Sequence, residues 1–100
     1  MACGYLLTIL IPCHSLQYLS RSIGSITRQT LPIEKFEVLL VADRVELVEV
    51  NKILGKSGLN FRVIESTNPG IVPALNLGLA NITSEFVARM DEDDLMMPDR

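Results

Sequence analysis

The sequence has few of the residues that some specialised small proteins use in quantity. Its 100 residues include two cysteines, one histidine and no tryptophan, and the net charge is −3. Two cysteines are too few for a disulfide framework, and no Cys/His cluster has the spacing of a zinc site. A nucleic-acid-binding domain needs a basic stripe, which this composition does not provide. We therefore expect reduced thiols and no nucleic-acid partner.

Long hydrophobic runs are also missing. The apolar segment Tyr5–Ile11 is too short to cross a bilayer. It has neither a basic flank nor a small-residue cleavage site, so we do not expect a signal peptide. The expected location is the cytoplasm, with the inner face of the membrane as the alternative. Any membrane association would come from segments outside this chain.

Short apolar runs alternate with helical patterns along the chain. Three runs rich in β-branched residues cover positions 6–11, 36–41 and 61–64, and a more mixed run covers positions 86–90. Near-continuous apolar runs are typical of parallel strands that are covered on both faces. The order β-α-β-α-β-α-β predicts one α/β domain over residues 1–100, with a mainly parallel sheet and helices on both faces.

Three helices are expected from apolar residues at three- and four-residue spacing. Ser15 is a candidate cap for the first helix, and Pro32 marks the region where it ends. Gly55 and Gly58 close the second helix, and Pro73 stands in the first turn of the third. The expected buried faces consist of Leu16, Leu19, Ile23 and Ile26; of Val45, Val48, Ile53 and Leu54; and of Ile71, Ala74, Leu75 and Leu79.

Each expected strand is followed by polar or turn-forming residues. These segments cover positions 12–15, 42–44, 66–70 and 91–94. Ligands of open α/β sheets bind beyond the carboxyl ends of the strands. We therefore expect the four segments to converge at one edge of the sheet and to form the binding site.

The acidic segment Asp91-Glu92-Asp93-Asp94 is the sharpest of the four. Adjacent carboxylates repel one another unless a cation neutralises them, and Mg²⁺ or Mn²⁺ prefers such oxygen ligands. Asp91, Asp93 and Asp94 are therefore candidate metal ligands. The alternative is a solvated acidic loop, or the first turn of a helix whose dipole favours negative charge.

Four other strand-end residues are candidates for ligand binding. The Asp43 carboxylate can accept hydrogen bonds from a base or ribose, or it can cap a helix that begins at Arg44. His14 can contact a nucleobase or serve a structural role. Asn68 and Gly70 precede the third helix, whose first N–H groups can face an anion or form an ordinary turn. Neither a Walker A loop nor a GxGxxG pattern follows the first strand.

Five segments, in this order, resemble glycosyltransferase family 2. Leu7–His14 resembles the family's opening strand, often V-S-V-I-I-P-x-Y-N, and Ser25–Thr30 resembles S-I-x-x-Q-T. Glu37–Asp43 resembles the strand that ends in V-D-D. Asn68–Gly78 is similar to N-x-G-x-x-x-A-x-N-x-G, and Val87–Asp94 to the segment carrying D-x-D-D. The resemblance covers nearly the whole chain.

The resemblance implies the N-terminal, nucleotide-sugar-binding part of a GT-A-type α/β/α sandwich, truncated after the D-x-D turn. Pro12, His14 and Asp43 would then line the pocket for the nucleobase and ribose. Asp91 would approach the nucleotide-sugar, and Asp93, helped by Asp94, would hold the metal at the diphosphate.

The implied reaction moves a sugar, with inversion, from a nucleotide-diphosphate sugar to a saccharide or lipid-linked acceptor. A UDP-sugar is the expected donor, and polysaccharide synthesis for the cell envelope is the expected process. The resemblance also implies that the general base lies beyond Arg100.

Departures from the family pattern keep two other hypotheses open. Ala42 replaces the first acid of V-D-D, and Arg44-Val45-Glu46 replaces the usual G-S-T turn. A non-catalytic nucleotide-binding or interaction module is therefore the main alternative. A nucleotidyltransferase is less favoured, because such enzymes carry a Gly-rich loop with Lys or Arg where this chain has Pro12-Cys13-His14-Ser15.

Overall fold

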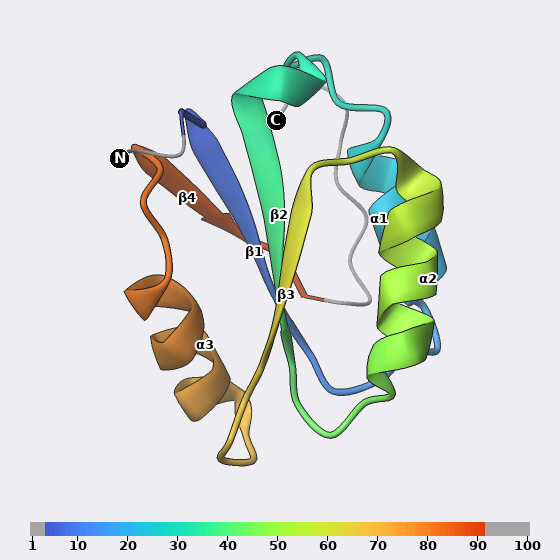
Figure 1. Ribbon diagram of the computed structural model, residues 1–100, viewed down its shortest axis with the longest axis vertical. Helices are drawn as coiled ribbons and strands as arrows, with labels where there is room; N and C mark the ends of the chain where they lie inside the picture. The colour runs from blue at the N-terminus through green and yellow to red at the C-terminus, as the bar shows by residue number, and fades with distance from the viewer. Residues whose placement is uncertain (1–3, 92–100) are drawn as a thin grey trace.

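A computed structural model describes residues 4–91, which fold into three layers. Within these residues the chain forms a four-stranded sheet of order β3-β2-β1-β4, and all neighbouring strands are parallel (Figure 1). The strands are β1 (Leu7–Cys13), β2 (Phe36–Ala42), β3 (Phe61–Glu65) and β4 (Phe86–Arg89). The helices are α1 (Leu19–Ile26), the short 3₁₀ helix η1 (Ile33–Lys35), α2 (Leu47–Ser57) and α3 (Ile71–Ala80).

The strand order explains how the helices are divided between the two faces. Helices α1 and α2 contact each other on one face, while α3 packs on β1 and β2 from the other face (Figure 1). Crossovers between parallel strands are right-handed, so connections that run in opposite directions place their helices on opposite faces. The chain moves outward from β1 to β3 and then returns past β1 to β4. The expected α/β fold with a parallel sheet is therefore confirmed.

The two central strands supply most of the core. Every residue of β2 is buried, and so is every residue of β1 after Leu7. Alternate residues face opposite layers. Ile9, Ile11, Val38 and Leu40 pack with α1 and α2, whereas Leu10, Leu39 and Val41 pack on the side of α3. The interpretation of these apolar runs as strands covered on both faces is correct for β1 and β2.

Helix α1 is shorter than its apolar pattern predicts. It begins at Leu19 after Tyr18, and it ends at Ile26 with Thr27 as its C-cap. Ser15 is not the cap: its Oγ accepts the N–H of Gln17 at 3.4 Å, before the helix begins. The prediction failed because a turn can bring Leu16 against the core as well as a helix can.

The buried face of α2 differs from the predicted one. Val48 is 61% exposed, and Val50 is buried in its place. Gly55 lies inside α2, while Gly58, at φ 77°, ends the helix in the left-handed conformation as predicted.

On α3 the predicted face was shifted. Ile71 is 49% exposed and Leu79 is 54% exposed, so neither faces the core. Ala74 is buried against the sheet as predicted, and Gly78, which the apolar pattern did not include, is buried with it. Small residues on this face let the backbone of α3 lie close to β1 and β2, which apolar periodicity by itself does not reveal.

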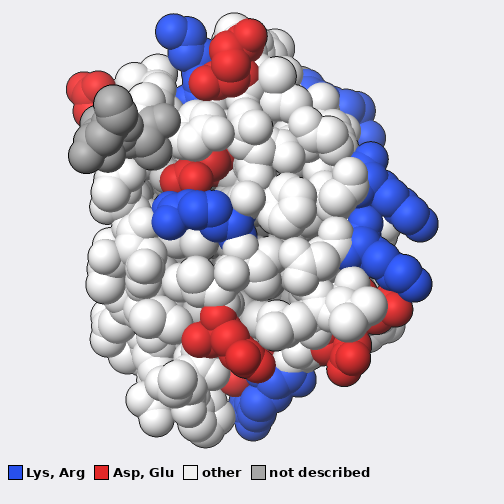
Figure 2. All heavy atoms as spheres, viewed as in Figure 1, with Lys and Arg blue, Asp and Glu red and all other residues white. Residues whose placement is uncertain are grey.

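Charged side chains gather in small groups on the face shown in Figure 2. Basic residues lie along the side of α2, and a mixed acidic and basic group lies at the lower end, where the strands finish. Among residues 4–91 no helix is both long and apolar enough to cross a membrane.

Candidate functional site

A pocket of about 360 Å³ opens at the carboxyl ends of β1, β2 and β4. Its size falls within the range of small-molecule sites. It is lined by Pro12, Cys13, His14, Asp43, Arg44, Gly70, Ile71, Ala74 and Asp91. Of the predicted ligand-binding residues, it therefore brings together Pro12, His14, Asp43, Gly70 and Asp91.

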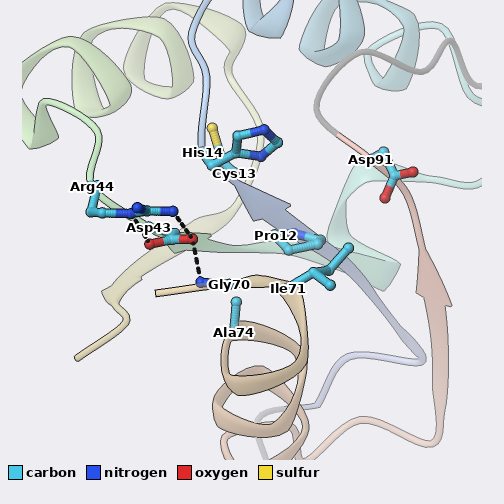
Figure 3. Close-up of a pocket in the computed structure, with 9 residues that line it drawn as sticks. All are labelled: Pro12, Cys13, His14, Asp43, Arg44, Gly70, Ile71, Ala74 and Asp91. Carbon is cyan, nitrogen blue, oxygen red and sulfur yellow. Dashed lines mark hydrogen bonds and ion pairs between the residues drawn. The ribbon is translucent and has the colours of Figure 1, made fainter. Parts of the chain in front are cut away.

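The pocket lies where the chain reverses its direction across the sheet. β1 stands between β2 and β4: the connection after β1 leads to β2 on one side, whereas the connection after β3 returns past β1 to β4 on the other side. Such a switch point leaves a crevice, because the two connecting loops move apart there. Figure 3 shows Asp43 and Arg44 at one end of the pocket and Asp91 at the other, with Pro12 and Ile71 between them.

The position of Pro12 and Cys13 differs slightly from the prediction. Both are the last residues of β1, paired with Val41 and Ala42, rather than part of the loop after it. His14 is the first residue beyond the strand, and it is exposed at the pocket. Cys13 is a buried thiol whose Sγ donates to the Ser15 carbonyl oxygen at 3.4 Å.

Asp43 is the most constrained acid of the site, with 5% of its surface exposed. Its Oδ2 accepts the backbone N–H of Gly70 at 3.0 Å, which ties the end of β2 to the start of α3. The hydrogen bond from Arg44, and then that from Gly70, hold the pKa of Asp43 below its ordinary value, although burial acts in the opposite direction. Asp43 is thus ionised at neutral pH.

Asp43 does not cap the helix that follows it. Helix α2 begins after Glu46, and within the described residues no side chain caps its first turn. The helix that Asp43 contacts is α3, through the N–H of its N-cap residue Gly70. The helix-cap alternative for the segment after Arg44 is therefore wrong.

Arg44 lies beside Asp43 in a conformation that few side chains adopt. Its φ of 59° is in the left-handed region, and it is the non-glycine residue with positive φ in the part of the chain described. Its Nε donates to Asp43 Oδ1 at 2.9 Å, and its second guanidinium nitrogen donates to Oδ2 at 3.4 Å (Figure 3). The sequence marked Arg44 as a departure from the family turn, but not as a lining residue.

Asn68 is the predicted ligand residue that does not line this pocket. It borders a separate shallow surface with Ser66 and Thr67, and its carbonyl oxygen accepts the Ser66 hydroxyl at 2.8 Å. The reason is the strand order. The loop that contains Asn68 starts from the outer strand β3, and its last residue, Gly70, is the one that reaches Asp43.

Asp91 directly follows Met90 beyond β4, as predicted, and its Oδ1 accepts a hydrogen bond from Arg89 at 3.2 Å. Among residues 4–91 no three His, Cys, Asp or Glu side chains form a group able to hold a metal ion. Asp93 and Asp94, the other two predicted ligands, lie outside the described residues. The described part of the site thus supplies one candidate metal ligand.

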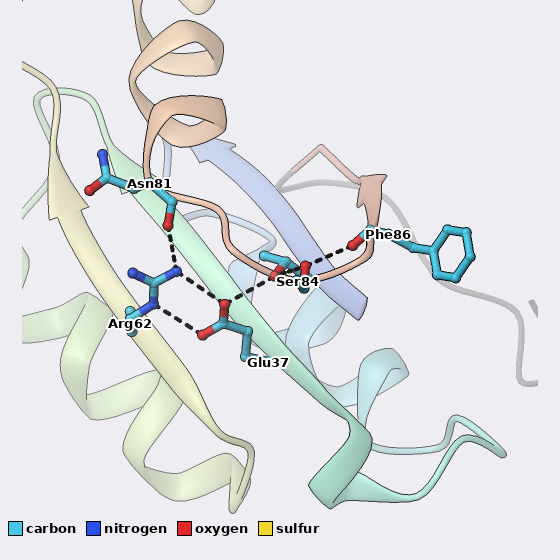
Figure 4. Close-up of polar contacts among 6 residues, drawn as sticks. Glu37, Arg62, Asn81, Ser84 and Phe86 are labelled. Atoms are coloured by element: carbon cyan, nitrogen blue, oxygen red, sulfur yellow. Dashed lines mark hydrogen bonds and ion pairs between the residues drawn. The ribbon is translucent and has the colours of Figure 1, made fainter. Parts of the chain in front are cut away.

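A second polar group lies at the opposite end of the sheet, near the amino ends of the strands (Figure 4). Arg62 donates to both carboxylate oxygens of Glu37 at 3.0 Å, and Thr8 donates to Glu37 Oε2 at 3.0 Å. Arg62 also donates to the Asn81 carbonyl oxygen at 2.8 Å, and Thr8 shares a hydrogen bond with Ser84. The sequence marks this group by polar residues within otherwise apolar strands, namely Thr8, Glu37 and Arg62, but the sequence analysis did not predict it.

Comparison with known proteins identifies the family. The sequence model described as glycosyl transferase family 2 matches residues 8–100. An uncharacterised glycosyltransferase of Haemophilus influenzae is 28% identical over 99 residues, and the match covers 96% of this chain. The succinoglycan biosynthesis protein ExoW of Rhizobium meliloti is 34% identical over 100 residues, and the match covers 93% of this chain. The matches cover 30% and 31% of those relatives' own length.

Solved structures support the same assignment at the level of fold. S. aureus TarS in complex with UDP-GlcNAc has a TM-score of 0.74 and 25% identity; the match covers 92% of this chain and 28% of that one. The mannosyltransferase PcManGT of Pyrobaculum calidifontis, in complex with GDP-Man and Mn²⁺, has a TM-score of 0.79 and 24% identity. That match covers 90% of this chain and 28% of that one. The expected GT-A-type fold is confirmed.

Proposed function

Because the chain belongs to glycosyltransferase family 2, we propose that it is the donor-binding part of a metal-assisted, inverting glycosyltransferase that uses a UDP-sugar. The observation that carries the proposal is the pocket at the switch point of the sheet. It joins a buried anionic acceptor, Asp43, with a second carboxylate, Asp91, across a cavity of about 360 Å³. We propose that residues 1–100 form the nucleotide-sugar-binding part of one domain.

Each lining residue has a proposed task in binding the donor. The Asp43 carboxylate is an acceptor that can read an N–H of the base or a hydroxyl of the ribose. Pro12 and His14, at the end of β1, form the surface against which the base lies. Gly70 has no side chain at the entry to α3, so the backbone there leaves room for the ligand.

The metal would be held at the Asp91 end of the pocket. Mg²⁺ usually takes one or two protein carboxylates and completes its shell with water and substrate phosphates. Asp91 fits this habit, because its side chain is 44% exposed and can turn from Arg89 toward a cation. We propose Asp93 and Asp94 as the further ligands. When bound, the ion stabilises negative charge on the departing diphosphate.

In this proposal, the general base and the acceptor site are not part of the pocket described above. Inversion requires a general base that faces the acceptor hydroxyl, opposite the leaving diphosphate. We propose that this base lies in a region that the longer relatives have and that this chain does not span. The name of one relative, the succinoglycan biosynthesis protein ExoW, supports the proposal of a saccharide or lipid-linked acceptor. A cytoplasmic location, where nucleotide-sugars are made, fits the same proposal.

Calorimetry with UDP, with and without Mn²⁺, tests this proposal. We expect UDP to bind in the presence of Mn²⁺, and chelation of the metal to weaken that binding, because the ion completes its coordination shell with the phosphates of the nucleotide. Asp91→Asn and Asp93→Ala should each reproduce the effect of chelation. The matched control is Glu85→Gln, an exposed acid next to β4 that does not line the pocket. If no condition gives UDP binding, the non-catalytic module becomes the better hypothesis.

A further inference from the structure

In the proposed nucleotide site, the carboxylate that would bind the nucleobase is already occupied by a neighbouring arginine. Asp43 is offered to the nucleobase as an acceptor, yet its side chain is 6% exposed and both of its oxygens are already engaged. Arg44 occupies the edge of the carboxylate with two hydrogen-bond donors, and Gly70 donates to Oδ2 from the backbone. Because Arg44 already donates to both oxygens, a base that approached this edge of Asp43 would compete with the guanidinium.

We propose that Arg44 is a latch that competes with the nucleobase for Asp43 and thereby sets the affinity of the donor site. The nucleotide binds after the guanidinium has left the carboxylate, and an N–H of the base takes its place. This inference rests on the proposed function of the pocket, and it assigns a specificity-determining task to a residue outside the predicted site.

The exposure of Arg44 makes the latch reversible. Its side chain is 69% exposed, so the guanidinium can turn into water without a large loss of hydration or packing. Ion pairs in which both partners are exposed contribute on the order of fivefold or less to an equilibrium, and the nearly buried Asp43 makes this pair somewhat stronger than that. A nucleotide can offset a cost of this size, so the latch lowers affinity without closing the site.

Asp43 does not need Arg44 to keep its position. The N–H of Gly70 holds Oδ2 at 3.0 Å, and this bond comes from the backbone at the start of α3. When Arg44 leaves, the carboxylate therefore remains aimed at the pocket. The two donors have separate tasks: Gly70 positions the acid, and Arg44 covers it.

The backbone of Arg44 explains why the two neighbouring side chains meet. Consecutive residues of a strand point to opposite faces, so an extended Arg44 would turn away from Asp43. At φ 59° the chain turns sharply just after β2, and the guanidinium comes back over the carboxylate. A non-glycine residue in this region is strained, and such strain is found most often at functional sites.

The first test compares UDP affinity by calorimetry in the wild-type chain, Arg44→Gly and Arg44→Ala. Glycine accepts a positive φ, so Arg44→Gly removes the latch and also suits the backbone. We expect both variants to bind UDP more tightly than the wild type, by about fivefold or more, because the pair that they remove has one nearly buried partner. The matched control, Arg21→Ala, removes an exposed arginine that does not line the pocket and should leave the affinity unchanged. Unchanged or weaker binding in both Arg44 variants would overturn the latch.

A second readout follows the guanidinium itself. In ¹⁵N NMR the Arg44 Nε–H signal, assigned by its loss in Arg44→Gly, should move toward the position of a solvated arginine as UDP is added. If the backbone signals of His14 and Gly70 respond to UDP while Arg44 does not move, nucleotide binding stands and the latch is wrong. If UDP moves no signal in the wild type or in Arg44→Gly, the proposed function fails, and the latch fails with it.

Discussion

The contribution of Asp43 to stability depends on pH, because its carboxyl group has a different pKa in the folded protein than in the unfolded chain. Its pKa in the folded protein is below the ordinary value, first because of Arg44 and second because of Gly70. A carboxyl group with a lowered pKa stabilises the fold above its unfolded pKa, about 4, and this contribution is lost as the pH falls further through the lowered value.

We therefore expect Asp43→Asn to lower the free energy of unfolding at pH 7, and the difference from the wild type to shrink below about pH 4. Asparagine has nearly the same shape, and its oxygen can still accept the Gly70 N–H, but its amide nitrogen cannot accept from Arg44, so the substitution removes the charge together with the Arg44 ion pair. Denaturant unfolding at a series of pH values measures the difference. A gap between the two proteins that is the same at pH 3 and pH 7 would contradict this account.

The position of Gly78 has no room for a side chain, because α3 lies close to the sheet at this point. A Cβ at Gly78 would clash with Leu10 Cδ1 and would stand 3.1 Å from Val41 Cγ2, and Leu10 is itself buried. We expect Gly78→Ala to lower stability by about 1–3 kcal/mol, as overpacking of a filled core does. The measurement is the midpoint of urea or thermal unfolding.

The control for Gly78 is Gly55, which lies inside α2. A Cβ at Gly55 would meet nothing within 4 Å, so Gly55→Ala adds helix propensity without a clash. We expect it to stabilise the chain by up to about 1 kcal/mol. If the two substitutions had the same effect, close packing would not be the reason for Gly78.

At the scale of the elements, the group around Glu37 joins all four strands and the end of α3. Glu37 on β2 is 3% exposed, Arg62 on β3 is 43% exposed, and Thr8 comes from β1. Asn81 follows α3, and Ser84, which precedes β4, donates to the Phe86 carbonyl oxygen at 2.9 Å. The group lies away from the pocket, so its energetic role can be measured apart from ligand binding.

Arg62→Met should lower stability by about 1–3 kcal/mol, because it leaves the buried Glu37 charge with Thr8 as its remaining partner. The double variant Glu37→Met/Arg62→Met should recover much of that loss, since removing both partners leaves no unpaired buried charge. A double-mutant cycle in denaturant measures the coupling between the two residues. Additive effects would show that the pair is not coupled.

A solvent-exposed pair on α2 provides the control for this cycle. Lys52 and Glu49 are 3.7 Å apart, and their side chains are 64% and 52% exposed. Pairs of this kind on helices contribute about 0.3–0.5 kcal/mol. Lys52→Met should therefore change stability far less than Arg62→Met, although both remove one basic partner of a glutamate.

Elements with a continuous apolar run agree with the prediction better than elements recognised only by the spacing of apolar residues. Strands β1 and β2 were predicted well, because short, near-continuous apolar runs are typical of strands that are covered on both faces of a parallel sheet. The start of α1 and the buried face of α3 were predicted less well. Apolar spacing identifies residues that meet the core, but it does not distinguish Leu16 in a turn from Leu19 in a helix.

At the scale of the whole molecule, the pocket depends on strand order rather than on any single motif. Residues that line it come from four separate parts of the chain: the ends of β1, β2 and β4 and the start of α3. Parallel strands place their carboxyl ends at one edge, and the reversal after β3 opens the crevice between them. The same order carries Asn68 away from the site, because its loop begins at the outer strand.

The sequence by itself determined the α/β class, the parallel strands and the acids that follow two of them, because burial and strand ends leave local patterns. It also carried the five segments by which the family is recognised. Tertiary structure decided which strand-end residues share a pocket, how Arg44 turns back over Asp43, and why Glu37 and Arg62 are polar inside the sheet. These features depend on contacts between residues 25 or more positions apart, or on a positive φ at one residue, and neither leaves a periodic signal in the chain.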